Sequence, residues 1–289
     1  MELIVPTQAQ GQSVREYLYA ALTDVPRWAI DETLRARDVR RGRERLGAQD
    51  TVCAGETLRV FLPQRALKQR ATPKIQAVYE DENVLLLVKP QGVSVMEEAG
   101  GDDMLTRARA HVAAQGGDAQ ALALCHRLDV NTGGLLLLSK NKAAYEAAYA
   151  AFEKRTMDKR YVCRVAGCPS EREAELHAYL RKDAQHARVQ VFSHPVPGAL
   201  PITTAYRVLE AGTISRLEVH LITGRTHQIR AHLAFIGHPI LGDDRYGERE
   251  INRREGVRRQ QLWATDLTFH ADGALAYLEG RHFHTDAPF

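Results

Sequence analysis

One short segment, residues 126–134 (His-Arg-Leu-Asp-Val-Asn-Thr-Gly-Gly), holds the side chains best suited to catalysis. Asp129 follows Arg127 by two residues, and a nearby cation favours the charged form of a carboxyl group. An ionised carboxylate held in a fixed orientation can act as a nucleophile or as a base. Asp and Asn side chains also stabilise ordinary turns by bonding to their own backbone. The segment alone leaves a catalytic loop and a structural turn both open.

Two apolar stretches flank this segment and must position it. Residues 121–125 and 135–139 are short and apolar, which favours two strands joined by a polar loop at the edge of a sheet. Residues 84–89 form a further apolar run closed by Pro-Gln-Gly, which predicts a buried strand that enters a turn. We interpret Lys89, at the end of this run, as a solvated turn residue.

The rest of the chain mixes strand and helix patterns without a regular βαβ alternation. Strands are predicted for residues 161–165, 204–209 and 216–222, and helices for residues 142–154 and 226–235. The sequence therefore predicts an α+β domain over residues 75–289, with a mixed, mostly antiparallel sheet and peripheral helices.

The first 62 residues predict a separate, small α/β domain. Apolar residues spaced like one face of a helix predict a helix over residues 14–22, and a second helix is predicted for residues 26–36. Residues 57–62 alternate polar and apolar side chains before a proline, which is typical of a strand. The next segment, residues 63–74, contains two prolines and several basic residues, and we interpret it as a linker.

Positive charge is concentrated in the N-terminal region. Residues 1–74 hold 13 Lys and Arg against 9 Asp and Glu, whereas the whole chain holds 39 against 36. Six arginines lie between residues 35 and 45, accompanied by two acidic residues. Arginine binds phosphate through its planar guanidinium group and stacks on bases, so this cluster indicates a nucleic-acid partner.

Length and composition exclude several classes of protein. The chain has 289 residues, 44% hydrophobic and 26% charged, as in an ordinary globular protein of about two domains. No apolar run approaches the roughly 20 residues that span a bilayer, and no secretory signal is visible. The cysteines and histidines show no zinc-site spacing, and His282-Phe283-His284 has no carboxylate in helical register nearby. We expect a soluble, cytoplasmic protein with reduced thiols and no bound metal.

Three long motifs, in order along the chain, resemble those of the RluA-type RNA pseudouridine synthases. They are residues 78–84 with the following Lys-Pro-Gln-Gly, the 126–134 segment, and residues 221–233 (Leu-Ile-Thr-Gly-Arg-Thr-His-Gln-Ile-Arg-Ala-His-Leu) continued by residues 237–247. The resemblance covers residues 75–262. In the N-terminal region, residues 25–63 resemble an S4-type RNA-binding domain.

The resemblance implies an isomerase that detaches uracil from its ribose and rejoins it through C5. Asp129 matches the catalytic nucleophile of the family, and Arg225 matches the basic residue that pairs with it. Tyr161 matches the tyrosine that stacks on the target base and could take part in proton removal at C5. Arg127 matches an arginine that fills the gap left by the flipped-out nucleotide, and we expect His126 to position this RNA-binding loop through hydrogen bonds.

The S4-like part implies contact with structured RNA through its helix pair and the loop that follows. Its best phosphate-contact candidates are Arg35, Arg37, Arg40 and Arg41. Family members with an S4 domain usually serve the large ribosomal subunit, so we expect ribosomal RNA rather than transfer RNA as the partner, and no membrane. The implied mechanism needs no metal or organic cofactor, and we expect a monomer.

The sequence departs from the family pattern at two motif positions. Gly133 replaces a serine, which we expect to loosen the loop, and Trp263 stands where a histidine is common. We interpret residues 248–259 as an extended charged loop, which would affect which RNA the protein selects and not the chemistry.

Two other classes of function compete with this interpretation. One is an RNA-binding or ribosome-assembly module without catalysis, against which the intact set of Asp129, Tyr161 and Arg225 argues. The other is an N-glycoside hydrolase that uses Asp129, which would need a second positioned carboxylate that no motif supplies.

Overall fold

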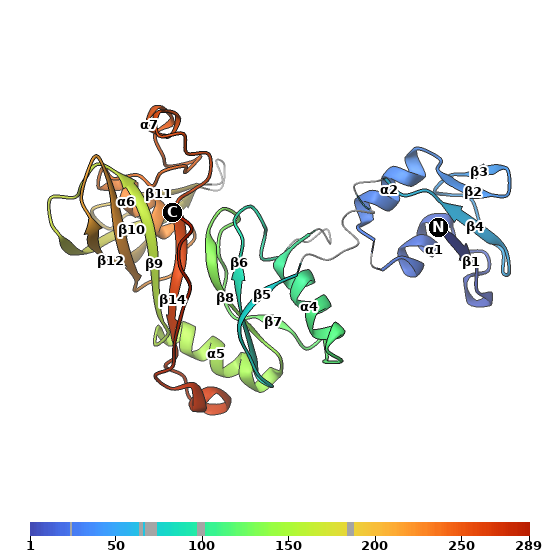
Figure 1. Ribbon diagram of the computed structural model, residues 1–289, viewed down its shortest axis with the longest axis horizontal. Helices are drawn as coiled ribbons and strands as arrows, with labels where there is room; N and C mark the ends of the chain where they lie inside the picture. The colour runs from blue at the N-terminus through green and yellow to red at the C-terminus, as the bar shows by residue number, and fades with distance from the viewer. Residues whose placement is uncertain (24, 64–65, 67–73, 97–101, 184–187) are drawn as a thin grey trace. The chain divides into compact units, whose positions relative to one another are not determined.

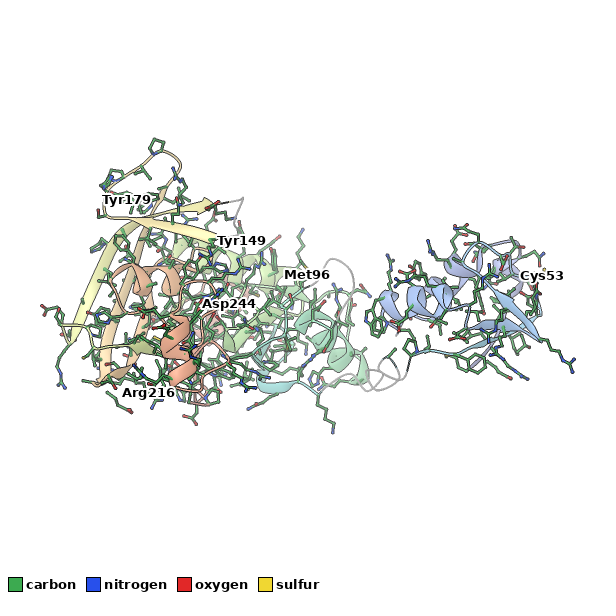
Figure 2. The ribbon with its side chains drawn as sticks, turned by 90° about the horizontal axis from the view of Figure 1, so that it is seen from above. Cys53, Met96, Tyr149, Tyr179, Arg216 and Asp244 are labelled. Atoms are coloured by element: carbon green, nitrogen blue, oxygen red, sulfur yellow. The ribbon has the colours of Figure 1, made fainter. Side chains whose placement is uncertain are left out.

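The computed structural model describes residues 1–289 except 24, 64–65, 67–73, 97–101 and 184–187. The chain divides into two compact units, residues 1–74 with 96–110 and residues 75–95 with 111–289 (Figure 1). Among the described helices, none is long and apolar enough to cross a membrane. The cysteines are free thiols; Cys53 is exposed on the N-terminal unit (Figure 2).

Two helices pack on one face of a four-stranded antiparallel sheet in the N-terminal unit. Its elements are β1 (Glu2–Ile4), the 3-10 helix η1 (Thr7–Ala9), α1 (Val14–Ala21), α2 (Arg27–Arg35), β2 (Val39–Arg41), β3 (Glu44–Leu46) and β4 (Thr57–Val60). The strand order is β1-β4-β2-β3. A capping box begins α1, because the backbone N–H groups of Ser13 and Glu16 each donate to the other residue's side chain. Leu18, Ile30 and Leu58 lie in the core between helices and sheet.

The sequence predictions for this unit agree with its elements. The predicted helices 14–22 and 26–36 and the predicted strand 57–62 correspond to α1, α2 and β4. Most of the predicted linker, residues 64–65 and 67–73, lies outside the described residues. Ala66 is buried in the core of the N-terminal unit.

An eleven-stranded mixed sheet forms the larger unit. Its first strands and helix are β5 (Gln76–Glu80), β6 (Val84–Lys89), β7 (Ala123–Leu124), β8 (Gly133–Ser139), α5 (Lys142–Lys154) and β9 (Asp158–Ala166). They are followed by β10 (Glu173–Asp183), β11 (Arg188–Phe192), β12 (Leu200–Glu210), β13 (Ile214–Leu221), α6 (Gln228–Phe235), α7 (Arg249–Arg254), β14 (Leu262–Thr268), the 3-10 helix η2 (Gly273–Leu278) and β15 (His282–His284). Between β6 and β7 the chain forms α4 (Met104–Ala114).

The strands of this sheet run in the order β11-β10-β12-β13-β9-β14-β8-β6-β5, with β15 beside β14 and β7 beside β8. Among the described strands, β8 and β14 form the one parallel pair, and the other pairings are antiparallel. This is the mixed, mostly antiparallel α+β fold that the sequence predicts. The parallel pair joins segments more than 120 residues apart, and β8 directly follows the 126–132 loop.

Helices cover this sheet where small or apolar side chains allow close packing. Helix α5 begins at Asn141, whose side chain accepts a hydrogen bond from the backbone of Ala144 at 2.9 Å. Its residues Ala144, Ala148 and Ala151 share one face and are buried against β6, β8, β14 and η2. Helix α6 packs on β11 and β12.

One predicted segment differs from the structure. Residues 248–259 are not an extended loop throughout, because α7 forms within them. Asn252 of α7 accepts a hydrogen bond from the backbone of Gly242 at 2.7 Å, which ties the helix to the loop after α6. No residue of α7 is buried. Hydrogen bonding by a polar side chain therefore fixes this charged segment, a contact that no apolar periodicity could signal.

Candidate active site

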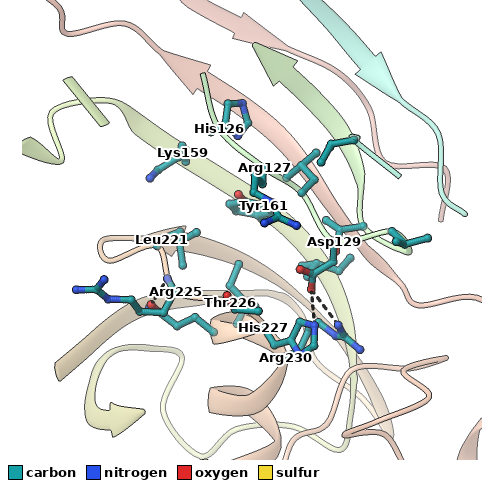
Figure 3. A pocket seen from close by; sticks show the side chains of 18 of the residues that line it. His126, Arg127, Asp129, Lys159, Tyr161, Leu221, Arg225, Thr226, His227 and Arg230 are labelled. Carbon is teal, nitrogen blue, oxygen red and sulfur yellow. Dashed lines mark hydrogen bonds and ion pairs between the residues drawn. The ribbon is translucent and has the colours of Figure 1, made fainter. Parts of the chain in front are cut away.

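The 126–132 loop borders a cavity of about 920 Å³ in the larger unit (Figure 3). This volume is within the range of pockets that hold ligands of nucleotide size. Cationic side chains outnumber carboxylates in its lining. The cations are Arg127, Arg155, Lys159, Lys182, Arg225, Arg230 and Arg245, and the carboxylates are Asp129, Glu153 and Asp244. A cavity with this balance attracts a phosphate-bearing ligand.

Asp129 is held by a buried arginine at the start of α6. Its carboxylate accepts a hydrogen bond from Arg230 at 2.9 Å, and its side chain remains 27% exposed to the cavity. The same guanidinium donates to Asp243 at 2.6 and 2.9 Å. Arg230 therefore contacts three carboxylates: Asp243 is buried, Asp129 can be reached by a ligand, and Asp244, 3.4 Å away, is largely exposed.

The Arg230–Asp243 pair stays ionised inside the protein. Burial acts to lower the pKa of Arg230, but the hydrogen bond to Asp243 and the charges of Asp243 and Asp129 raise it well above its ordinary value. Burial acts to raise the pKa of Asp243, but the hydrogen bond and charge of Arg230 leave it below its ordinary value. Arg230 is thus a permanent cation beside Asp129.

Arg225 does not pair with Asp129, so the sequence-based expectation for this residue is wrong. Its side chain is exposed, and Figure 3 shows the guanidinium directed away from Asp129. Only its backbone is fixed, donating to Gln228 at 3.1 Å. His227 adopts the left-handed conformation (φ 55°) immediately before α6. The chain therefore changes direction between Arg225 and Arg230, and only the later arginine lies on the inward face of the helix.

A buried polar network fixes this turn and the start of α6. The Gln228 side chain accepts from Thr223 at 2.8 Å and donates to Thr204 at 3.0 Å. His232, on the next turn of α6, lies 3.1 Å from the Thr204 hydroxyl. Burial lowers the pKa of His232 to about 4, with a further contribution from His177, so this imidazole stays neutral near pH 7. The network orients the helix that carries Arg230.

Tyr161 lies in the middle of β9 and lines the cavity (Figure 3). It pairs with Val219 of β13 and Ala264 of β14, and it is 5% exposed. Burial and then the negative charge of Asp129 raise the pKa of its hydroxyl. The phenol therefore stays protonated at neutral pH. The free site offers a neutral aromatic ring beside the carboxylate.

His126 and Arg127 differ sharply in their surroundings, although both line the cavity. The His126 ring accepts a hydrogen bond from the backbone of Leu137 at 3.1 Å through Nε2. Burial, and then the charge of Lys159, lower the pKa of His126 to about 3. His126 is thus a neutral group that anchors the loop to β8. Arg127, one residue later, is exposed and can reach a ligand.

Lys89 is fully buried at the end of β6, so its interpretation as a solvated turn residue is wrong. Its ammonium donates to the carbonyls of Pro90, Val93 and Val130, at 3.0, 2.7 and 2.9 Å. Val130 directly follows Asp129. The buried cation therefore ties the turn after β6 to the loop that carries the candidate nucleophile.

The side chains of Gln260, just before β14, and Gln91, in the turn after β6, brace the same loop. The Gln260 side chain donates to the hydroxyl of Thr132 at 2.7 Å, and Gln91 donates to the carbonyls of Asn131 and Gln260. Gln91 and Lys89 lie at the end of β6 and in the turn that follows it, and they contact two successive residues of the loop, Val130 and Asn131. Asp129 is positioned by hydrogen bonds on both sides.

The two departures from the family pattern are in direct contact. Gly133 and Trp263 are register partners in the parallel β8–β14 pair. A Cβ atom at position 133 would overlap the ring of Trp263. The indole thus fills the space that a larger side chain at position 133 would occupy, so the two departures compensate each other in packing.

The four arginines predicted to contact phosphate lie in the N-terminal unit and do not line the cavity. Arg35 and Arg37 are exposed, and Arg37 has a left-handed backbone (φ 52°). Arg41 forms ion pairs with two glutamates of its own unit, Glu44 at 3.0 Å and Glu56 at 3.1 Å. Arg40 lies against the ring of Phe61, 5.0 Å from its centre.

Comparison with known proteins identifies this combination of fold and site. Residues 83–235 match the RNA pseudouridylate synthase family. The chain is 32% identical to the ribosomal large subunit pseudouridine synthase C of Vibrio vulnificus strain CMCP6 over 274 residues, 90% of this chain and 85% of that protein. It is 31% identical to the protein of the same name from Escherichia coli K12 over 279 residues, 91% and 86% of the two chains.

A solved structure agrees with these sequence relatives. The human RNA Pseudouridylate Synthase Domain Containing 1 superposes with a TM-score of 0.62 at 26% identity, over 76% of this chain and 86% of that chain. The fold and the matches define an enzyme that isomerises uridine in RNA. The chain belongs to the RNA pseudouridylate synthase family.

Proposed function

We propose that this enzyme converts a uridine of large-subunit ribosomal RNA to pseudouridine, with Asp129 as the nucleophile. The observation that carries the proposal is a partly exposed carboxylate, fixed by a permanent cation at 2.9 Å, in a cavity of about 920 Å³. The names of the relatives from Vibrio vulnificus and Escherichia coli support the choice of ribosomal RNA.

The geometry suggests a role for each side chain. The target nucleotide must leave its stack to enter the cavity. Asp129 forms a bond to C1′ as the bond from C1′ to N1 breaks, and the freed uracil turns so that C5 faces the sugar. The bond from C1′ to C5 then forms, the carboxylate is released, C5 loses its proton and N1 gains one. Alignment of the nucleophile contributes much of such a rate increase.

Arg230 and Tyr161 act on this reaction in different ways. Arg230 holds one oxygen of Asp129 in place and stabilises its negative charge when the sugar is released. Tyr161 offers its ring as a stacking face, a contact worth about 1–3 kcal/mol per base. The raised pKa of Tyr161 keeps its phenol protonated in the free enzyme. We therefore do not assign the Tyr161 hydroxyl as the base that removes the proton from C5. Arg127, exposed on the same loop, occupies the gap that the extruded nucleotide leaves.

We further propose that residues 1–62 form an S4-like RNA-binding domain, joined by residues 63–74 to a catalytic domain of residues 75–289. The exposed Arg35 and Arg37 are its candidates for phosphate contact on the helical side. Arg41 is a weaker candidate than the sequence suggests, because two glutamates already neutralise it.

The Asp129→Asn variant tests the nucleophile. We expect it to bind RNA like the wild type and to lose tritium release from C5-labelled uridine in RNA, because a neutral amide does not attack C1′. Glu153→Gln is the matched control. Glu153 lines the same cavity, and its side chain is exposed. Retained turnover in Asp129→Asn would refute the assignment.

Two further readouts address the reaction and the substrate. If the wild type released free uracil without forming pseudouridine, the N-glycoside hydrolase alternative would be correct. Mapping pseudouridines in large-subunit ribosomal RNA from cells with and without the gene identifies the target. If no ribosomal uridine differed between the two, the proposed substrate would be wrong even though the chemistry stands.

A further inference from the structure

The N-terminal sheet has an outer face that its helices do not cover. Apolar residues of its inner face, such as Val39, Leu46 and Leu58, are completely buried. On the outer face, a row runs across all four strands through register partners, and it consists of Glu2, Arg59, Arg40 and Arg45. Three neighbouring strands thus present three arginines side by side.

An exposed aromatic ring completes this face. Phe61 follows Arg59 by two residues, so its side chain emerges on the same side as that arginine. Phe61 is 47% exposed. The Arg40 guanidinium lies over the ring, 5.0 Å from its centre. Phe61 and Arg40 thus form a stacked pair at the surface, and we call these four residues (Arg40, Arg45, Arg59 and Phe61) the outer-face cluster.

The stability of the sheet does not explain this cluster. Like charges directly opposite each other on neighbouring strands are destabilising, and Arg40 faces an arginine on both sides. Among the described residues, no carboxylate forms an ion pair with Arg40, and its Nε atom is buried without a hydrogen-bond partner. The carboxylates beside the row are Glu2, 2.9 Å from Arg59, and Asp38, 4.0 Å from Arg45. The positive charge in the middle of the face remains unneutralised.

We propose that the outer-face cluster binds an unpaired segment of the RNA substrate. A base stacks on the Phe61–Arg40 pair, and Arg59 and Arg45 contact the phosphates on either side of it. Single strands suit this surface because their bases are free to stack on aromatic rings and guanidinium planes, whereas the bases of a duplex are already stacked. The proposal rests on RNA being the substrate, and it adds a second contact surface to the helical side of the same unit.

The test measures binding of the full-length protein to a short fluorescent oligoadenylate, which contains no uridine for the catalytic cavity. Phe61→Leu keeps the apolar bulk but removes the stacking face, and we expect affinity to fall by about tenfold. Phe61→Tyr restores a ring and should bind like the wild type. Replacing Arg45 and Arg59, the two proposed phosphate contacts, by Gln should lower the slope of log affinity against log salt by about 1.4.

Two controls separate this surface from general charge effects. Arg207→Gln removes an arginine of β12 that is 57% exposed, pairs with Glu218 and does not line the cavity, and it should leave oligoadenylate binding unchanged. A guanosine–cytidine duplex of equal length should bind the wild type and Phe61→Leu equally.

Each contrary result would overturn the inference. Wild-type affinity of Phe61→Leu for oligoadenylate would exclude stacking, and equal losses for duplex and single strand would exclude a preference for unpaired RNA. Polyglutamate binding that was as tight as RNA binding and lost in the same variants would indicate an acidic protein partner instead. None of these outcomes affects the Asp129→Asn result, so the cluster and the catalytic proposal can fail separately.

Discussion

Asp129 owes its position to an arginine that is itself immobilised. Arg230 is 5% exposed and its second partner, Asp243, is completely buried. Removing one partner of a buried ion pair leaves an uncompensated charge, which costs about 3–5 kcal/mol. The pair with Asp243 therefore stabilises the fold, while the hydrogen bond to Asp129 places the carboxylate in the cavity. The Arg230 guanidinium group therefore contributes both to the stability of the fold and to the position of the candidate nucleophile.

The two arginines of the 221–233 motif should behave differently when replaced. Arg230→Gln leaves Asp243 buried without its cation, so we expect a loss of about 3–5 kcal/mol in the free energy of unfolding and loss of turnover. Arg225→Gln removes an exposed side chain, so we expect an unchanged unfolding midpoint and an RNA affinity reduced by about tenfold or less. Urea denaturation and tritium release measure the two effects. Unchanged stability in Arg230→Gln, with turnover lost only in Arg225→Gln, would restore the sequence-based assignment.

Sequence reasoning located this motif but selected the wrong arginine, for a geometric reason. Arg225 and Arg230 both follow β13 within nine residues, and nothing in their types distinguishes them. The left-handed turn at His227 decides which one faces the cavity, and a non-glycine residue gives no clear signal of that conformation. The burial of Lys89 is not predicted from the sequence, for a related reason. Lysine is rarely fully buried, and the three carbonyls that bind it become neighbours only in the folded chain.

The β8–β14 pairing shows that two substitutions can compensate each other between strands. Gly133→Ser should force the new side chain against Trp263 and destabilise the protein by about 1–3 kcal/mol. Trp263→His alone should leave a cavity and destabilise it as well. The double variant should be more stable than the sum of the two losses predicts, with a coupling of about 0.5–3 kcal/mol. Urea denaturation of the four proteins measures the coupling, and additive losses would show that the two positions are independent.

Strand β15 is held to β14 by a carboxylate between two histidines. The Asp266 carboxylate lies 2.9 Å from His282 and 2.8 Å from His284, and it pairs with them across the two strands rather than in the helical register in which the sequence shows no carboxylate. The hydrogen bond to Asp266 raises the pKa of His284, burial acts to lower it, and a weaker contribution from the hydrogen bond to Asp286 raises it further. Burial acts to raise the pKa of Asp266, but hydrogen bonds from Thr265, His284 and His282, with the charge of His284, leave it below its ordinary value. Both shifts favour the ion pair.

The direction of each shift gives the pH range in which β15 is stabilised. A raised histidine pKa adds stability that is complete below about pH 6.5 and is lost as pH rises through the folded value. A lowered aspartate pKa adds stability that is lost as pH falls below about 4. We expect hydrogen exchange at the β15 amides to show more protection at about pH 6 than at about pH 8, after correction for intrinsic rates. His284→Gln should remove most of this difference, and a difference retained in that variant would contradict the assignment.

The elements that sequence patterns predict well are those with one dominant physical signal. Strand β6 is a run of apolar residues, and α5 is alanine-rich with a polar cap, so both are predicted. Strands β10 and β11 were not predicted, because exposed and buried positions alternate there among charged residues and the hydrophobic contrast is weak. Helix α7 buries no side chain, so it has no amphipathic pattern to detect.

The whole molecule separates its tasks between two units. The cavity is lined only by residues of the larger unit, whereas the excess of positive charge lies in the N-terminal 74 residues. We expect the cavity to carry the chemistry and the N-terminal arginines to contact RNA, so that the two tasks can be changed separately.

Deleting residues 1–62 tests this division directly. Because each phosphate contact displaces condensed counterions, losing three or more arginine contacts should lower RNA affinity and reduce the slope of log affinity against log salt by at least about 2. The cavity residues all remain in the truncated chain, so turnover at saturating RNA should persist if that chain folds, which circular dichroism can verify. Binding is measured by fluorescence anisotropy over a salt series. An unchanged slope would mean that the N-terminal arginines do not touch RNA, and a well-folded truncated enzyme without turnover would mean that the N-terminal unit takes part in the reaction itself.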